Sequence, residues 1–345
     1  MFDRLVGNER AKDVLRRMLA QGRVPGALLF GGEDSVGKFQ FAVELAKALN
    51  CLRPRGVEAC DKCPACKRIP HFVPSPSDNE EKKRFIAWSD YPDVALVRRE
   101  VSVITVHQAR RIERESNFRP NEGRARVFII DNADQMNEQA SNALLKTLEE
   151  VAPTSHLVLV TSRPASLLQT IRSRCQSIRF APLSAAEIEK HLVGNKLRAG
   201  GEAKLVARLS RGRLGEALAL NPDAYRARRE LMLGVLDSLT ARPADLARLL
   251  RATEELGDAK RKDDFESHLD ALSAVVRDAW LLSIDPEAEI VNEDIRDRLA
   301  RHAAALAAGR AVRWLSQIEH LRAQLAVNVN RRAATDALFL SMAAA

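Results

Sequence analysis

The sequence predicts an α/β protein in which a parallel sheet covered by helices is followed by segments that are entirely helical. Through the first half of the chain, short apolar runs alternate with helical patterns, which is typical of parallel sheets with helices on their faces. A glycine-rich segment follows the first of these runs and opens a helical pattern. Beyond Leu183 we find amphipathic helical segments and no convincing strand.

Strands are predicted where short apolar runs are bounded by turn residues. The candidates are residues 27–32, 94–99, 126–131, 156–162 and 176–183.

Helices are predicted between these strands from apolar residues at helical spacing. The segment 39–50 places Phe41, Leu45 and Ala48 on one face. The segment 137–151 has the same pattern, and Pro153 ends it, because proline cannot continue a helix. Its apolar face consists of Ala140, Leu144, Thr147 and Val151.

Helix starts are predicted from two pairs with the spacing of a capping box, Ser166 with Gln169 and Ser184 with Glu187. They place helix starts near residues 167 and 185. The segment 70–84 is rich in proline, serine and charge and is predicted to be a surface loop.

Charge and composition favour an ordinary soluble protein with an acidic partner. The net charge is +8 and the isoelectric point is near 9.4, and nucleic acid is the commonest acidic partner of such a chain. The N-terminal residues MFDRLVGNER lack the apolar run of a secretory signal, and no segment of 18 uncharged apolar residues occurs. We therefore expect a cytoplasmic protein without membrane spans.

The segment 31–40 matches a phosphate-binding loop as far as its lysine. Gly32, Gly37 and Lys38 have the spacing G-x-x-x-x-G-K, in which backbone N–H groups and the lysine hold phosphate. The next residue should carry a hydroxyl for Mg²⁺, but it is Phe39. We predict a vestigial site that can bind ATP or ADP without hydrolysing it.

A second nucleotide signature is incomplete in the same way. The apolar run 126–131 ends in Asp131, which would organise Mg²⁺, but Asn132 stands where a glutamate should polarise the attacking water. Asparagine carries no charge and is a poor base. The alternative is that Asp131 and Asp134 only cap the following helix.

Four cysteines give the most specific local pattern. Cys51, Cys60, Cys63 and Cys66 have the spacing C-x8-C-x2-C-x2-C, from which four thiolates can close on one tetrahedral Zn²⁺. Four protein ligands leave no open position, so the predicted zinc module, residues 51–66, is structural. Cys175 stands apart and is predicted to be an inert buried thiol.

Arg172 and Arg174 lie between a short predicted helix and the last predicted strand. From spacing alone, they are solvated charges at a helix C-terminus, where the helix dipole favours cations.

Together these features resemble the bacterial DNA polymerase III clamp-loader subunits of the AAA+ class. The resemblance rests on FDRLVGNERAKDVLRRML, GGEDSVGK, the cysteine insert, VFIIDNADQMNEQASNALLKTLEEVAP and LVTSRPASLLQTIRSRCQ. It covers residues 1–220 closely and the C-terminal helices more loosely, including NVNRRAATDALFL.

The family contains ATP-hydrolysing motor subunits, gamma or tau, and a delta-prime kind that is usually a non-hydrolysing stator. Motors carry G-K-T or G-K-S, an acidic pair, and an arginine in a lid segment where this chain has Gly215. Phe39, Asn132 and Gly215 all differ from the motor pattern, and in this respect the chain resembles the delta-prime kind.

The resemblance implies an AAA+ ATPase-like domain over 1–182, a helical lid over 183–222 and a helical collar for oligomerisation over 223–345. It also implies that Arg174, in Ser173-Arg174-Cys175, acts as an arginine finger in the ATP site of a neighbouring subunit. The implied partners are the gamma/tau motor and delta subunits, the sliding clamp and primed DNA. The chain would then be a subunit of the polymerase III holoenzyme and not an enzyme by itself.

Two other hypotheses remain open: an active gamma/tau-like ATPase, and a zinc-ribbon DNA-binding protein. The segment 70–89 is longer than the family pattern leads us to expect, and Trp88 beside it is predicted to pack on the domain.

Overall fold

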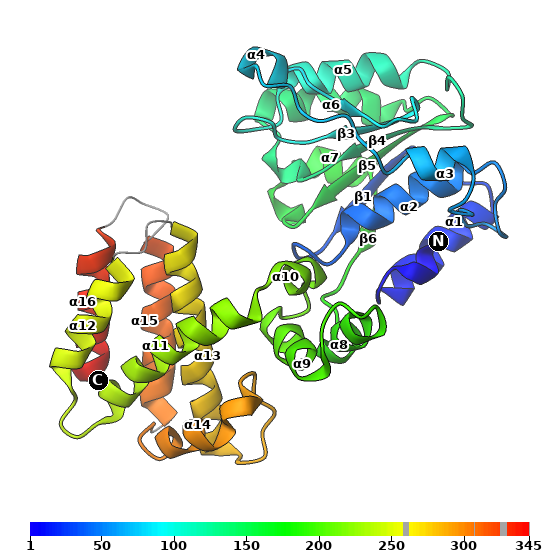
Figure 1. Cartoon of the computed structure of the whole chain (residues 1–345). Helices are drawn as coiled ribbons and strands as arrows, with labels where there is room; N and C mark the ends of the chain where they lie inside the picture. The colour runs from blue at the N-terminus through cyan, green and yellow to red at the C-terminus, as the bar shows by residue number, and fades with distance from the viewer. Residues whose placement is uncertain (258–261, 307, 325–329, 345) are drawn as a thin grey trace. The chain divides into compact units, whose positions relative to one another are not determined.

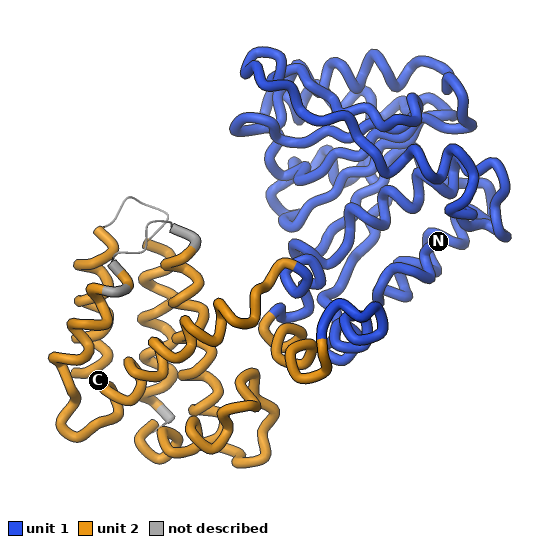
Figure 2. The backbone as a smooth tube through the Cα atoms, in the orientation of Figure 1, with its two compact units in different colours: residues 1–198, 210–218 blue, residues 199–209, 219–345 orange. Residues whose placement is uncertain are grey.

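The computed structural model describes residues 1–257, 262–306, 308–324 and 330–344. The chain forms two compact units, unit 1 over 1–198 and 210–218 and unit 2 over 199–209 and 219–345 (Figure 2). Asn328 and Val329 of the C-terminal stretch that contributes to the resemblance lie outside the described residues. In the described ranges, no helix is both long and apolar enough to cross a bilayer.

Unit 1 is built on a six-stranded sheet with the order β2-β3-β4-β5-β1-β6 (Figure 1). All neighbouring strands are parallel except β2 and β3. The strands are β1 Ala27–Gly31, β2 Ala87–Trp88, β3 Val94–Val97, β4 Arg126–Ile130, β5 Ser155–Thr161 and β6 Gln176–Arg179. All five predicted strands are present, but β6 covers only the first half of the predicted residues 176–183, and β5 begins one residue earlier than predicted. The strand β2, only two residues long, was not predicted.

Helices cover both faces of this sheet. Leu28 and Phe30 of β1 share one core with Phe41, whereas Ala27 and Leu29 share the other with Leu144. The alternation follows from the period of two in a strand. The first face carries α1 Glu9–Ala20, α2 Lys38–Asn50 and α3 Pro64–Arg68, and the second carries α5 Val106–Ser116, α6 Glu138–Glu149 and α7 Gln169–Arg174.

The predicted helix faces are buried, except at Val151, which is half-buried and lies beyond the end of α6. Of the two predicted capping boxes, the one at Ser166 is wrong. Ser184 caps α8 Ala185–Gly194 in a reciprocal capping box with Glu187. Ser166 instead lies in a short 3-10 helix, η3 Pro164–Ser166, and α7 follows Leu168 without a side-chain cap. Because Ser166 already takes part in a helical turn, it does not have the extended backbone that an N-cap needs.

The segment 70–89 is a loop with some structure of its own. It contains α4 Asn79–Lys82, capped by Asp78, and Phe72 forms an isolated bridge with Ser89. Trp88 packs on the domain as predicted, since its ring meets Phe128 edge to face at a centroid distance of 6.0 Å.

The rest of the described chain contains helices and no further strand. Unit 1 also has η1 Phe2–Arg4, η2 Ala133–Gln135 and α10 Leu214–Ala219. Unit 2 consists of α9 Gly200–Leu209, α11 Pro222–Thr240, α12 Leu246–Gly257, α13 Lys262–Ile284, η4 Glu293–Ile295, α14 Arg296–Ala303, α15 Ala308–Gln324 and α16 Arg331–Ala344. Its core includes the fully buried Phe265, Trp314 and Phe339. The division into three domains stays a prediction.

A buried carboxylate holds the turn that leads into β4, and its loss should destabilise unit 1. Asp93 is fully buried and accepts hydrogen bonds from the backbone N–H groups of Asn121, Glu122 and Gly123 at 2.6, 2.8 and 2.7 Å. We expect Asp93→Ala to lower the free energy of unfolding by about 3–5 kcal/mol, because these donors lose a charged acceptor. Urea denaturation checks this.

The control is Asp90→Ala, which removes an exposed carboxylate from the same loop and should change stability by less than about 0.5 kcal/mol. Equal stability of the two variants would contradict the role given to Asp93.

Candidate functional site

A pocket of about 600 Å³ lies where β1 ends and α2 begins. Its floor is the predicted phosphate-binding loop, and its walls come from segments far apart in the sequence. The lining includes Arg4, Leu5, Val6, residues 34–41, Asp131, Asn132, Val160, His191, Leu214, Gly215 and Leu218. Of the predicted nucleotide-binding residues, Gly37, Lys38 and Asp131 line this pocket, whereas Gly32 is not among its lining residues.

Lys38 is folded into its own loop. Its Nζ donates to the carbonyl oxygen of Gly32 at 2.8 Å and also to that of Glu33. The residue is only 5% exposed, and this burial lowers the pKa of the amine, against the raising effect of nearby carboxylates. The acceptors of this lysine are therefore carbonyl oxygens of its own loop and not phosphate oxygens.

The two glycines of the loop are needed for different reasons. A Cβ on Gly32 would lie 2.2 Å from the carbonyl oxygen of Phe180, so only glycine lets the loop pass this backbone. Gly37 has a φ of 99° at the N-cap of α2, a conformation that side chains rarely adopt. The loop therefore keeps its backbone architecture.

Phe39 occupies the position at which a hydroxyl would bind Mg²⁺. Its ring is partly buried and lies 6.3 Å, between centroids, from the ring of Phe72 in the segment 70–89. Because phenylalanine has no oxygen, this position offers no metal ligand.

Asp131 and Asn132 follow β4 at the edge of the pocket. The Asn132 N–H donates to Asp131 Oδ1 at 3.1 Å. Burial raises the pKa of Asp131, opposed by the charge of Arg98. Asn132 has a left-handed backbone with φ 52° and supplies no carboxylate at the second acidic position.

The alternative that Asp131 and Asp134 cap the following helix is wrong for α6. The side chain of Asn137 caps α6 by accepting from the Ala140 N–H at 2.8 Å. Asp134 instead accepts from Thr161 Oγ1 at 2.6 Å and forms an ion pair with Arg163 at 3.2 Å.

Gly215 places α10 directly on the phosphate-binding loop. Its N–H donates to the Ser35 carbonyl oxygen at 2.9 Å, and a Cβ at this glycine would lie 3.1 Å from Ser35 Cβ. A longer side chain at this position would crowd the loop. The contact joins residues 180 positions apart, and no local sequence signal could have predicted it.

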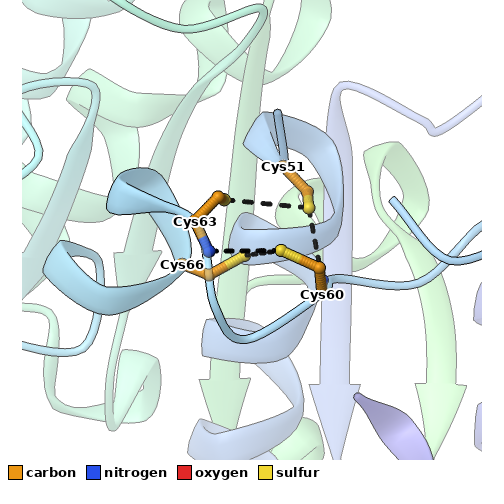
Figure 3. Close-up of side chains that lie close together, drawn as sticks. All are labelled: Cys51, Cys60, Cys63 and Cys66. Carbon is orange, nitrogen blue, oxygen red and sulfur yellow. Dashed lines mark hydrogen bonds between the residues drawn. The ribbon is translucent and has the colours of Figure 1, made fainter. Parts of the chain in front are cut away.

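The four predicted metal ligands converge on one point (Figure 3). Cys51, Cys60, Cys63 and Cys66 are all buried, and their sulfur atoms lie within 4.8 Å of one another. The Sγ atoms of Cys51 and Cys63 are 3.9 Å apart, and those of Cys60 and Cys66 are 4.0 Å apart. Tetrahedral Zn²⁺ with bonds of about 2.3 Å needs sulfur atoms about 3.8 Å apart, so the cluster fits such an ion.

Backbone donors favour a thiolate in this cluster. The N–H groups of Lys62 and Cys63 donate to Cys60 Sγ, and they lower the pKa of this thiol to about 6. Thiolates are the form in which cysteines bind metals. The insert is therefore a buried four-cysteine cluster that can bind a metal such as zinc.

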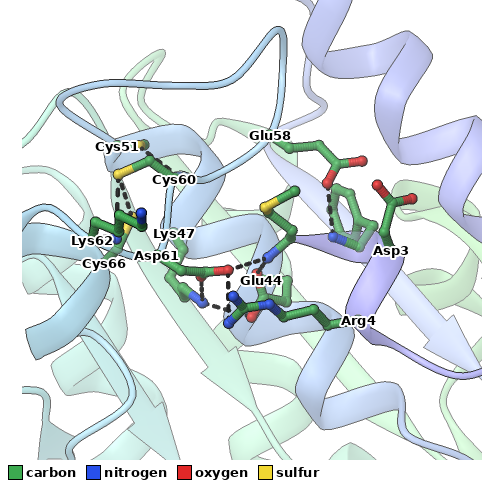
Figure 4. A network of polar contacts seen from close by, with 12 residues as sticks. Asp3, Arg4, Glu44, Lys47, Cys51, Glu58, Cys60, Asp61, Lys62 and Cys66 are labelled. Carbon is green, nitrogen blue, oxygen red and sulfur yellow. Dashed lines mark hydrogen bonds and ion pairs between the residues drawn. The ribbon is translucent and has the colours of Figure 1, made fainter.

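Charged residues beside the cysteines anchor the insert to the N-terminal elements (Figure 4). Glu58 accepts from the Phe2 N–H at 2.9 Å and from Arg16 Nε at 2.7 Å. Asp61 pairs with Lys47 of α2 and with Arg4 at 3.3 Å. No local pattern predicts these pairs, because Phe2, Arg4 and Arg16 lie far from the insert along the chain.

Arg174 lies near the start of β1, whereas the phosphate-binding loop follows the end of that strand. It lines a second pocket of about 460 Å³ with residues 25–27, which lead into β1, whereas Gly32–Lys38 follow the end of β1. Its Nε donates to Glu149 Oε1 at 2.7 Å. Cys175 beside it is buried, which raises the pKa of its thiol to about 11, in keeping with an inert thiol.

Comparison with known proteins identifies the family. The family model "DNA polymerase III, delta subunit" matches residues 7–184. The chain is 28% identical to the delta' subunit of Bacillus subtilis (strain 168) over 96% of this chain and 95% of that protein. It is 27% identical to the delta' subunit of Escherichia coli (strain K12) over 94% and 87% of the two chains.

A tau subunit matches over a smaller share of its length, and a solved structure is similar at low identity. The tau subunit of E. coli K12 is 31% identical over 65% of this chain but only 33% of its own length. A gamma subunit-related protein of Thermotoga maritima has a TM-score of 0.41 and 20% identity, over 96% of this chain and 98% of that one.

The matches to delta' subunits extend over nearly the whole chain, including the helical region beyond the sheet. The α/β sheet domain, the four-cysteine insert and the helices that follow are the architecture that the resemblance to AAA+ clamp-loader subunits implies. The chain therefore belongs to the DNA polymerase III delta subunit family, as a clamp-loader subunit of the delta' type.

Proposed function

We propose that this chain is a non-hydrolysing, stator-like subunit of the clamp loader, which helps to assemble the complex and supplies Arg174 to ATP held by a neighbouring motor subunit. The observation that carries the proposal is Phe39, whose ring packs toward Phe72 at the position of the Mg²⁺-binding hydroxyl. The partly buried ring carries no oxygen, so no rotation of this side chain supplies a metal ligand.

Two further features support the loss of hydrolysis. Asn132 cannot polarise water as a glutamate does. Lys38 already donates to Gly32 and Glu33. Weak binding of ATP or ADP at Gly32, Gly37, Lys38 and Asp131 is compatible with this proposal, because the glycine loop and one acidic residue remain.

The position of Arg174 supports action on a neighbour. Its pocket lies where the chain enters β1, and the chain's own loop follows the other end of that strand. A guanidinium offers a planar fork of donors to a phosphate, and arginine fingers in NTPases contribute about 10³–10⁵-fold in rate.

The proposed partners are the gamma/tau motor and delta subunits, the sliding clamp and primed DNA, in the cytoplasm. The net charge of +8 is compatible with contact to DNA in the assembled complex. In this proposal, residues 1–182 form the ATPase-like domain, 183–222 the lid and 223–345 the collar that joins the other subunits.

The proposed role of zinc is structural. Cys51, Cys60, Cys63 and Cys66 would hold the ion and tie the insert together, and four ligands leave no position for a substrate. A zinc-ribbon DNA-binding function is disfavoured, since Glu58 and Asp61 face the N-terminal segment and α2 in charged contacts. An active ATPase is disfavoured by Phe39 and Asn132.

Protein purified without chelator under reducing conditions should contain one equivalent of zinc. Cys63→Ser should lose most of the metal, because it removes one of four ligands, whereas Cys175→Ser should retain it. Metal analysis measures both. Less than half an equivalent in the wild-type protein would argue against the site.

The isolated chain should hydrolyse ATP at no more than the background rate, since Mg²⁺ lacks its hydroxyl ligand and water lacks its base. Phosphate release with and without Lys38→Ala measures this. Steady turnover that disappears in the Lys38→Ala protein would show an active ATPase and refute the stator proposal.

Arg174→Ala in a reconstituted clamp loader should leave folding and assembly intact but reduce DNA-stimulated ATP hydrolysis and clamp loading. Arg172→Ala is the matched control, because it removes an exposed arginine two positions away on the same helix. If both activities of Arg174→Ala stay within about twofold of wild type, the effect is below roughly 0.4 kcal/mol and Arg174 is only a surface charge.

A further inference from the structure

The backbone of Arg174 is fixed, so its function depends on where the side chain points. Arg174 is the last residue of α7. Ile171, one turn earlier, is fully buried in the core that α7 shares with α6, and the following Cys175 is buried in the same core. The side chain of Arg174 can therefore change its hydrogen-bond acceptors, whereas the backbone cannot move.

In the free chain, that side chain is held by α6. Arg174 Nε donates to Glu149 Oε1 at 2.7 Å, and its Nη2 donates to the same oxygen. Its Nη1 donates to the Thr170 carbonyl oxygen at 2.9 Å. Glu149 is the last residue of α6, so the contact joins the ends of two helices.

The pair is accessible to a third group. The side chains of Arg174 and Glu149 are 33% and 47% exposed, and both line the pocket of about 460 Å³. An ion pair with this much solvent contact is weak enough to exchange partners. The pocket gives an approaching anion space beside the guanidinium.

We infer that Glu149 is a positioning residue that holds Arg174 in the absence of ATP at the neighbouring site and is displaced by the phosphate of that ATP. The inference rests on the proposed function of Arg174. Glu149 and a phosphate compete because both accept from the same N–H groups, and because their negative charges repel each other. The bond from Nη1 to Thr170 does not involve Glu149 and can orient the side chain in both states.

This arrangement fixes the position of the Arg174 side chain when the neighbouring site holds no nucleotide. Without Glu149, the arginine would present an uncompensated positive charge to its neighbour at all times. With Glu149, the charge becomes available when an anion strong enough to replace the carboxylate arrives. Glu149 therefore lowers the affinity of the neighbouring site for ATP. In return, the contact between Arg174 and that site forms only when ATP is bound.

The test is steady-state ATP hydrolysis by the reconstituted clamp loader, with KM and kcat measured separately. Glu149→Gln keeps the shape of the side chain but removes the competing charge. We expect its KM for ATP to fall roughly two- to fivefold, the range that exposed ion pairs cover, while kcat stays within about twofold. Glu150→Gln, which removes an exposed carboxylate from the next position, should leave both parameters unchanged.

The double variant Glu149→Gln with Arg174→Ala separates positioning from a general charge effect. If Glu149 acts through Arg174, the fall in KM disappears in the Arg174→Ala background. An unchanged KM in Glu149→Gln, or a fall that persists without Arg174, overturns this inference alone. A wild-type result for Arg174→Ala itself overturns the arginine finger, and the positioning role with it.

A spectroscopic measurement on the isolated chain tests the ion pair without any partner. Exchange of the Arg174 Nε–H with water, followed by NMR, should be faster in Glu149→Gln than in wild type or Glu150→Gln. Equal exchange in the three proteins would show that Glu149 does not hold the arginine and would overturn the inference.

Discussion

Burial of both faces of β1 is the constraint on which the rest of unit 1 depends. All five residues of this strand are buried, with Leu28 and Phe30 in one core and Ala27 and Leu29 in the other. The strand pairs with β5 on one side and β6 on the other, so both of its ends are fixed. The phosphate-binding loop leaves one end, and the pocket of Arg174 lies at the other.

This geometry shows that the phosphate-binding loop is held by contacts within the protein, which is compatible with the proposed loss of hydrolysis. Gly32 is required by the close carbonyl of Phe180, and Lys38 and Gly215 bind loop carbonyls. Each contact stabilises the loop from within the protein. Phe39, at the start of α2, packs toward Phe72 of the long segment 70–89.

Two kinds of contact stabilise the cysteine insert: the cluster of its thiols and the ion pairs of its carboxylates. Four buried thiols meet at one point, and Glu58 and Asp61 on the same loop bind the N-terminal segment, α1 and α2. Buried carboxylates need such partners, because an unpaired charge in this environment is costly. The insert is therefore part of the fold of unit 1 and not an appendage.

The sequence by itself determined the local features. These are the strands other than β2, the buried residues of α2 and α6, the capping box of Ser184, the four-cysteine pattern, and the unusual residues Phe39 and Asn132. These depend on periodicity, spacing and residue chemistry within a short window. It wrongly assigned Ser166 as a capping residue, because residues 164–166 form a 3-10 turn before α7 begins. The tertiary structure alone decided which distant residues meet: Phe39 with Phe72, Gly215 with Ser35, Glu58 with Arg16, and Arg174 with Glu149. Such contacts form when strands and helices that are distant in the sequence pack on a common core. No local sequence pattern predicts which of their side chains will meet.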